Sequence, residues 1–111
     1  MLRPDVLRDN RDFNRLYKKG KALHGKYLVI VFKNNNLGYT RKAFLASKKV
    51  GNAVKRNRAR RLMKEAYRLL GIEIKDGYDI IFIARKGITD ASCEEVLRTM
   101  TSAFQNGKLE K

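Results

Sequence analysis

The chain has 111 residues and a formal net charge of +15, from 26 Lys and Arg against 11 Asp and Glu. Its length predicts a single domain, residues 1–111, and a hydrophobic content of 43% excludes a chain disordered by composition. No apolar run approaches the roughly 20 residues of a membrane span, and no secretory or lipidation signal is present, so we expect a cytoplasmic protein without a membrane partner.

The first predicted element is a short helix that Asp9 or Asn10 caps and Gly20 ends. A strand follows over residues 26–33, where apolar side chains on both faces indicate a largely buried position. Asn and Gly residues then tolerate a turn, so residues 39–47 are predicted to return as the second arm of a hairpin. One face of the helix carries aromatic and apolar residues at i, i+3 and i+4: Phe13, Leu16 and Tyr17.

A strongly basic helix is predicted from Ala53, with Asn52 as its N-cap. Like charges at i,i+4 on its outer side cost an isolated helix roughly 0.2–0.5 kcal/mol per pair, so a polyanionic partner would stabilise this arrangement. Only one carboxylate, Glu65, lies within residues 47–68. We therefore expect this segment to bind nucleic acid rather than to be a merely solvated surface. Its apolar stripe comprises Ala59, Leu62, Met63, Ala66, Leu69 and Leu70.

The last third of the chain contains a second buried strand and a final helix. The strand is predicted over Tyr78 to Ala84, and the helix is predicted to open at Thr89 or Asp90. Together these elements predict an α/β (α+β) two-layer sandwich with one sheet. The residues expected to point inward from the last helix are Val96, Leu97, Met100, Ala103 and Phe104, and the phenylalanines expected in the core are Phe32, Phe44, Phe82 and Phe104.

Catalytic and metal-binding constellations are missing from the sequence. There is no Ser/His/Asp or Cys/His arrangement and no phosphate-binding loop, and the acidic residues are too scattered for a two-metal nuclease. A single cysteine, Cys93, cannot form an intramolecular disulfide, and with the single histidine, His24, it cannot complete a zinc site. We therefore expect no catalytic residue and no metal ligand in this chain.

Three segments resemble the bacterial ribonuclease P protein subunit. The longest runs from Ser47 to Ala66 and contains Arg56-Asn57-Arg58, followed by the basic pair Arg60-Arg61. Asp12 to Gly20 resembles the family's first helix, and Asp79 to Arg85 resembles its late core strand. The length of the first match makes the resemblance highly specific.

The resemblance implies the protein subunit of a ribonucleoprotein endonuclease (a hydrolase) in which the RNA is the catalyst. Such a subunit binds the catalytic RNA and the 5′ leader of precursor tRNA, and magnesium is held mainly by the RNA, with no cofactor on the protein alone and no DNA partner. The implied fold is ribosomal-protein-like: a mostly antiparallel four-stranded sheet, about three helices and a left-handed βαβ crossover, against the usual hand. A structural ribosomal protein, a general RNA chaperone and a protein-only nuclease remain as alternatives.

Two sets of residues are expected to contact RNA. The basic helix and the turn before it form the first set. The second is a cleft for the leader, in which aromatic rings would stack on bases; the family often has an aromatic residue on the first long strand there, where this chain has Ile30, with Tyr27 nearby. A pair at helical spacing such as Phe13 and Tyr17 is also typical of a core, so both interpretations stay open. The sets are Lys48, Lys49, Asn52, Lys55, Arg56, Asn57, Arg58, Arg60, Arg61, Lys64 and Arg68 for RNA binding, and Phe13, Tyr17, Tyr27 and Ile30 for the cleft.

Overall fold

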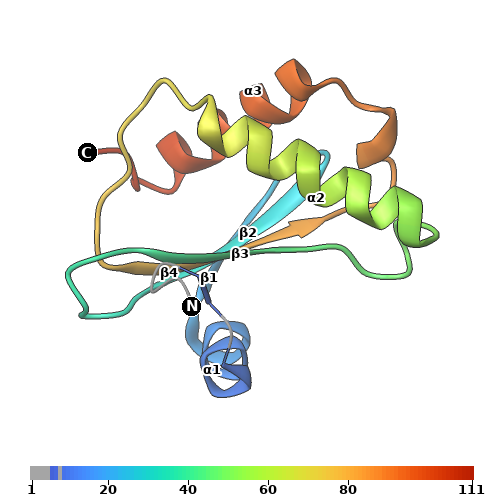
Figure 1. The fold of residues 1–111 in the computed structure, drawn as a ribbon. Helices are drawn as coiled ribbons and strands as arrows, with labels where there is room; N and C mark the ends of the chain where they lie inside the picture. The colour runs from blue at the N-terminus through green and yellow to red at the C-terminus, as the bar shows by residue number, and fades with distance from the viewer. Residues whose placement is uncertain (1–5, 8) are drawn as a thin grey trace.

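The chain folds into a four-stranded sheet with helices on both faces. The structure is a computed structural model that describes residues 6–7 and 9–111. Figure 1 shows α2 (Ala53–Arg68) and α3 (Cys93–Asn106) together on one face of the sheet and α1 (Asn10–Lys19) on the other. The elements in chain order are α1 (Asn10–Lys19), β1 (Lys21–His24), β2 (Leu28–Asn34), β3 (Arg41–Leu45), α2 (Ala53–Arg68), β4 (Tyr78–Ala84), the 3-10 turn η1 (Ile88–Asp90) and α3 (Cys93–Asn106). The predicted fold class is confirmed.

The strands lie in the order β1-β2-β4-β3, so the predicted hairpin between β2 and β3 is wrong. β2 pairs antiparallel with β1 and β4, whereas β3 pairs with β4 in parallel. Because β2 and β4 both carry apolar side chains on their two faces, they occupy the buried centre of the sheet and β3 is left at the edge. The backbone N–H of Asn35 donates to the carbonyl of Gly77 at 2.8 Å, which directs residues 35–40 past β4.

The sequence did not predict β1, because this strand is short and three of its four residues are exposed. The parallel neighbours β3 and β4 are joined through α2, so the chain contains the βαβ crossover that the resemblance implies. The left hand expected for this crossover stays a prediction.

Capping side chains set the helix ends. Asp9 accepts a hydrogen bond from the backbone N–H of Arg11 at 2.8 Å, and Asn52 accepts one from that of Lys55 at 3.0 Å, which confirms both predicted N-caps. The last helix starts at Cys93, later than predicted, because residues 88–90 form the separate turn η1. Ser92 and Glu95 then form a capping box with two hydrogen bonds of 3.1 Å.

The main hydrophobic core lies between the sheet and the α2–α3 layer. Leu28, Ile30 and Phe32 of β2 point into this core together with Ile80 and Phe82 of β4. The inward residues predicted for α3 are confirmed, with Leu97 partly buried and the others buried. Phe32, Phe82 and Phe104 are buried as predicted, but Phe44 is only half-buried, although its ring stacks on that of Phe82 with centroids 4.7 Å apart.

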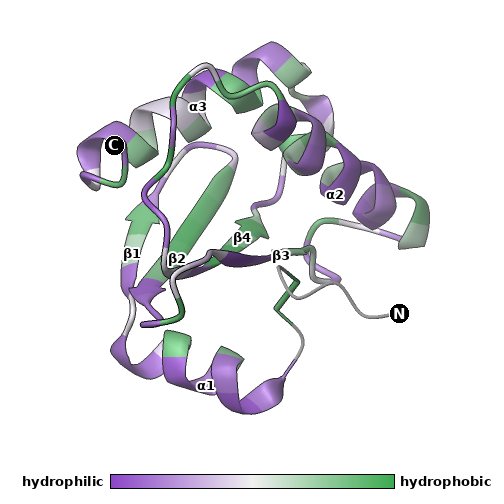
Figure 2. Ribbon diagram, turned by 60° about the vertical axis from the view of Figure 1, so that its left-hand side comes forward, coloured by the Kyte–Doolittle hydropathy of each residue, from purple (hydrophilic) through white to green (hydrophobic). Residues whose placement is uncertain are grey.

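A smaller cluster lies on the other face of the sheet, beneath α1. Its buried members are Leu7, Leu16, Val31, Ala43 and Ile81. Figure 2 shows the hydrophobic residues of α1 on the side turned toward the sheet, and hydrophilic residues around the rest of the helix. Because one short helix covers this face, its margin stays partly exposed, at Phe13, Val29, Leu45 and Ile83.

None of the helices formed by residues 6–7 and 9–111 has the apolar length to cross a bilayer.

Candidate nucleic-acid interface

The outer surface of α2 gathers the predicted RNA-binding residues. Ala59, Met63 and Ala66 have no exposed surface, and their burial against the core turns the remaining faces of the helix outward. All eleven predicted residues lie on this helix or on the turn before it. Arg56 and Arg60 are half-buried, and the nine exposed residues are Lys48, Lys49, Asn52, Lys55, Asn57, Arg58, Arg61, Lys64 and Arg68.

Few of these cations are neutralised within the protein. Arg68 pairs with Glu65, and this hydrogen-bonded partner holds the pKa of Glu65 below its ordinary value. Arg60 donates to the amide oxygen of Asn57, and Arg56 donates to the carbonyl of Gly51 at 3.3 Å. In the part of the chain that the structure describes, no ion pair is made by Lys48, Lys49, Lys55, Arg58, Arg61 or Lys64. This surface, which we call the cationic face of α2, has a high density of positive charge that phosphates would neutralise.

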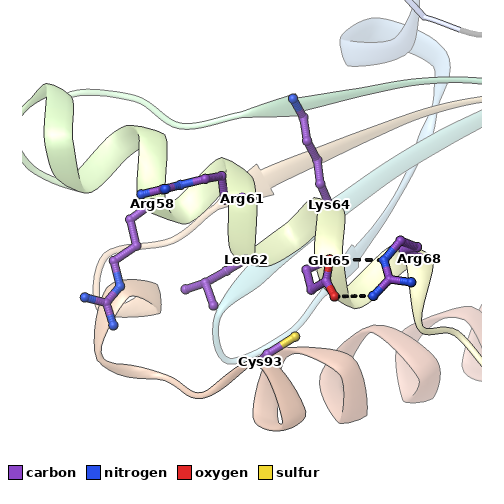
Figure 3. Close-up of a pocket in the computed structure, with 7 residues that line it drawn as sticks. All are labelled: Arg58, Arg61, Leu62, Lys64, Glu65, Arg68 and Cys93. Atoms are coloured by element: carbon purple, nitrogen blue, oxygen red, sulfur yellow. Dashed lines mark hydrogen bonds and ion pairs between the residues drawn. The ribbon is translucent and has the colours of Figure 1, made fainter.

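A groove of about 570 Å³ runs along the α3 side of this helix. In Figure 3 the side chains of Leu62 and Cys93 lie in the space between α2 and the start of α3, with the Glu65–Arg68 pair beside them. Leu62, predicted in the buried stripe, is thus only half-buried. Leu69, from the same stripe, is exposed because the helix ends one residue earlier.

A second groove, of about 640 Å³, crosses the edge strand β3 between α1 and α2. We call it the β3 groove. It combines three aromatic rings with three cations, which are the two kinds of side chain that hold single-stranded nucleic acid by stacking and by phosphate contact. The aromatic residues are Phe13, Phe44 and Tyr67, the cations are Lys42, Lys64 and Arg68, and the remaining lining comes from Val6, Leu7, Ala43 and Leu45.

The structure separates the four residues predicted for the cleft. Phe13 lines the β3 groove, and Tyr17, one turn further along α1, is 56% exposed, so Tyr17 is not a core residue. Ile30 is completely buried on the opposite face of the sheet, which makes its assignment to the cleft wrong. Because side chains alternate along a strand, an error of one residue reverses the face, and the neighbouring Val29 is the half-exposed residue on the α1 side.

Tyr27 also lies away from the β3 groove. Its ring packs against the α2–α3 core, with the amino group of Lys26 5.3 Å from the ring centre. Its hydroxyl donates to Glu95 at 2.9 Å, at the start of α3. Tyr27 therefore does not line the β3 groove; it tethers the loop before β2 to α3.

Three groove residues were missed from the sequence: Lys42, Phe44 and Tyr67. Lys42 and Phe44 alternate on β3 with residues of the opposite face, and Tyr67 lies just outside the predicted apolar stripe of the basic helix. In the structure the amino group of Lys42 lies 5.2 Å from the ring centre of Tyr67, a cation–π distance. The alternation in β3 was a usable signal, but only the pairing of β3 with β4 shows that the strand is an edge.

The acidic residues that the structure describes are scattered over the molecule. Among residues 6–7 and 9–111, no three His, Cys, Asp or Glu side chains gather closely enough to bind a metal ion. Asp12 and Asp79 do converge, but on the guanidinium of Arg41, which forms ion pairs with both. The side chains present thus do not fit a protein-borne two-metal centre.

Comparison with known proteins places these features in one family. The family model described as Ribonuclease P matches residues 1–108. The "Ribonuclease P protein component" of Pelotomaculum thermopropionicum is 38% identical over 107 residues, or 96% of either chain. That of Clostridioides difficile is 50% identical over 91 residues, which cover 81% of this chain and 80% of the relative. The solved structure of the Staphylococcus aureus RNase P protein superposes with a TM-score of 0.84 at 29% identity, covering 98% of this chain and all of that one.

Proposed function

The chain belongs to the family of ribonuclease P protein components, and we propose that it binds the catalytic RNA of ribonuclease P together with the 5′ leader of precursor tRNA. Membership implies an RNA partner within a ribonucleoprotein. The observation that carries the proposal is the continuity of two surfaces: Lys64 and Arg68 belong both to the cationic face of α2 and to the wall of the β3 groove. One protein can therefore contact a folded RNA and an adjoining single strand.

The two surfaces suit different RNA structures. The cationic face of α2 neutralises phosphates of a folded RNA, and the counterions released on contact supply most of the binding free energy. The β3 groove offers Phe13, Phe44 and Tyr67 to an extended strand, where each stacked base contributes about 1–3 kcal/mol without demanding a particular sequence. A leader that differs between precursors can be held in this way.

The catalytic step, in this proposal, belongs to the RNA. Magnesium, in the same proposal, is held by the RNA subunit of a cytoplasmic holoenzyme. The described residues support this assignment, since they offer no carboxylate cluster for metal-assisted hydrolysis by the protein. The protein contributes binding and orientation of the precursor. Its charge of +15 also lowers the phosphate repulsion between enzyme RNA and substrate RNA, and thereby lowers the magnesium concentration that cleavage requires.

A reconstitution assay tests this proposal. The purified chain is added to precursor tRNA at low magnesium, with and without a bacterial ribonuclease P RNA. We expect no cleavage by the protein alone, and cleavage at a lower magnesium concentration when protein and RNA are combined than with the RNA alone. Cleavage by RNA-free protein at a rate that follows its concentration would identify a protein-only nuclease. No effect on the RNA enzyme, together with binding to ribosomal RNA, would instead identify a ribosomal protein or an RNA chaperone.

A further inference from the structure

One guanidinium joins three elements at the end of the sheet beside the β3 groove. Arg41, the first residue of β3, donates from Nε and Nη2 to the two carboxylate oxygens of Asp79 on β4, at 2.8 and 2.7 Å. Its Nη1 lies 3.3 Å from Oδ2 of Asp12 on α1. The side chains of Arg41, Asp12 and Asp79 are only 21%, 17% and 10% exposed. We call Asp12, Arg41 and Asp79 the Arg41 cluster.

Apart from this ion pair, α1 touches the sheet over a small area. Leu16 is the only residue of the helix that is fully buried, and it packs on Val31, Ala43 and Ile81. A small apolar interface holds a helix near a surface but resists sliding poorly, since the hydrophobic effect is non-directional. A charge-assisted hydrogen bond has a preferred geometry. Asp12 therefore supplies a directional contact between α1 and the sheet, in addition to the connection of α1 to β1 through Gly20.

The ion pair also connects the two walls of the β3 groove. Asp12 directly precedes Phe13, which lines the α1 wall, and Arg41 directly precedes Lys42, which lines the β3 wall. We propose that the Asp12–Arg41 ion pair is a positioning device that sets the separation of Phe13 from β3, and thus the fit of the groove to a single RNA strand. This inference rests on the proposed function, in which the groove holds the precursor leader.

The rest of the cluster is built so that Asp12 can be changed without loss of the fold. Asp79 holds Arg41 through two hydrogen bonds, and Asn35 donates to the same carboxylate at 2.9 Å, so Arg41 keeps a partner when Asp12 is neutralised. The hydrogen bonds to Asp79 raise the pKa of Arg41 above its ordinary value, which keeps the guanidinium charged. Replacing Arg41 would instead leave the buried Asp79 without its charged partner, which is strongly destabilising.

Asp12→Asn is thus the informative variant, because it keeps the shape of the side chain and removes its charge. Asp9→Ser is the matched control: it removes one negative charge next to the same helix, from an exposed pair with Arg11, and serine remains a good N-cap. Asp12→Glu restores the charge. The measurements are amide hydrogen exchange of the free protein, and the affinities of the reconstituted holoenzyme for precursor tRNA with a leader of several nucleotides and for mature tRNA.

We expect Asp12→Asn to speed exchange in α1 while exchange in α2 and β4 stays unchanged. The preference for precursor over mature tRNA should fall about tenfold, the equivalent of one stacked base. Affinity for mature tRNA should not change, whereas a variant that was merely less folded would lose both affinities together. Asp12→Glu should recover the preference, and Asp9→Ser should behave as the wild type does.

The two measurements separate failure of this inference from failure of the proposed function. Unchanged exchange in α1 of Asp12→Asn would overturn the positioning role. So would faster exchange in α1 with an undiminished leader preference. A wild-type holoenzyme without any leader preference would overturn the proposed function and the ligand assigned to the groove, and the exchange data would still decide whether Asp12 holds α1 in place.

Discussion

The two faces of the sheet differ although the same strands form both. On the face covered by α2 and α3, side chains such as Ile30, Ile80 and Phe82 have no exposed surface. On the face under α1, Val29, Leu45 and Ile83 remain partly exposed around a small buried cluster. Alternate residues of one strand therefore have different tasks: those toward α2 and α3 stabilise the fold, and those toward α1 leave an apolar margin beside the β3 groove.

The difference follows from how much helix each face receives. Two helices of 16 and 14 residues cover the first face, whereas a single helix of 10 residues covers the second. Apolar and aromatic side chains that stay partly exposed beside cations are the composition of a single-strand binding surface. We therefore expect substitutions on the first face to change stability, and substitutions at the second to change RNA binding.

The largest expected effect compares the same substitution on the two faces. Ile30→Ala should lower the free energy of unfolding by about 2–5 kcal/mol, since the side chain is completely buried. Ile83→Ala, on the half-exposed face, should cost about half of that or less, because the side chain is only partly buried and water already reaches the site. Denaturant unfolding of the RNA-free variants, followed by circular dichroism, measures both. Equal losses of stability would show that the two faces are equally buried.

The next effect concerns RNA affinity at an exposed ring. Tyr17→Ala should weaken binding of precursor tRNA with a leader of several nucleotides by about 1–3 kcal/mol and leave binding of mature tRNA unchanged. Because Tyr17 is 56% exposed, the melting temperature should change little. Tyr39→Ala, at a similarly exposed ring in the loop before β3, is the matched control and should leave both affinities unchanged. A stability loss of about 3–5 kcal/mol, as for a core aromatic residue, would contradict this leader-binding role of Tyr17.

The cationic face of α2 should act through salt-dependent binding. Arg60→Ala combined with Arg61→Ala should reduce the slope of log K against log salt for holoenzyme assembly by about one to two units, because each arginine that neutralises a phosphate adds about one unit to the slope. The control removes two cations outside α2, by Arg98→Ala within α3 and Lys108→Ala just after it, and should leave the slope unchanged. A folded Arg60/Arg61 variant with the wild-type slope would mean that these side chains face solvent in the complex.

The smallest expected effect is on the pH dependence of stability, and it concerns the start of α3. Hydrogen bonds from the backbone of Ser92 and from the hydroxyl of Tyr27 hold the pKa of Glu95 below its ordinary value of 4.5. A lowered folded-state pKa means that the stabilisation is present above 4.5 and is lost as the pH falls through the folded-state value. Glu95→Gln retains a hydrogen-bond acceptor without titrating, so its melting temperature should fall less steeply with acid than that of the wild type. Parallel curves for the two proteins would contradict this role of Glu95.

Parts of this architecture could be predicted from the sequence because they depend on local signals. Asp9 and Asn52 are capping residues beside clear helical periodicity, and β4 follows from the apolar run of residues 80–84. The order of the strands could not be predicted, because pairing depends on distant partners. The assignment of Ile30 to the cleft failed for a related reason: both faces of β2 are apolar, and only the placement of the helices tells them apart.

The β3 groove illustrates the same limit. Phe13, Phe44 and Tyr67 come from three elements, and nothing in their spacing along the chain indicates that they line one groove. Phe44 was expected in the core, and this is correct for one side of its ring, which packs inward on Phe82. The residue nevertheless borders the groove as well. For half-buried aromatic residues of this kind, the sequence does not show which part of the ring borders a groove, and only the fold does.

The most direct test of the division between the two faces is methyl NMR of the isoleucine side chains during titration with a short single-stranded RNA. Isoleucines lie on both faces: Ile83 borders the α1 side, whereas Ile30 and Ile80 are buried beneath α2 and α3. We expect the methyl resonance of Ile83 to shift with added RNA, while those of Ile30 and Ile80 stay in place. Shifts at Ile30 and Ile80 with none at Ile83 would contradict the assignment of RNA binding to the α1 side of the sheet.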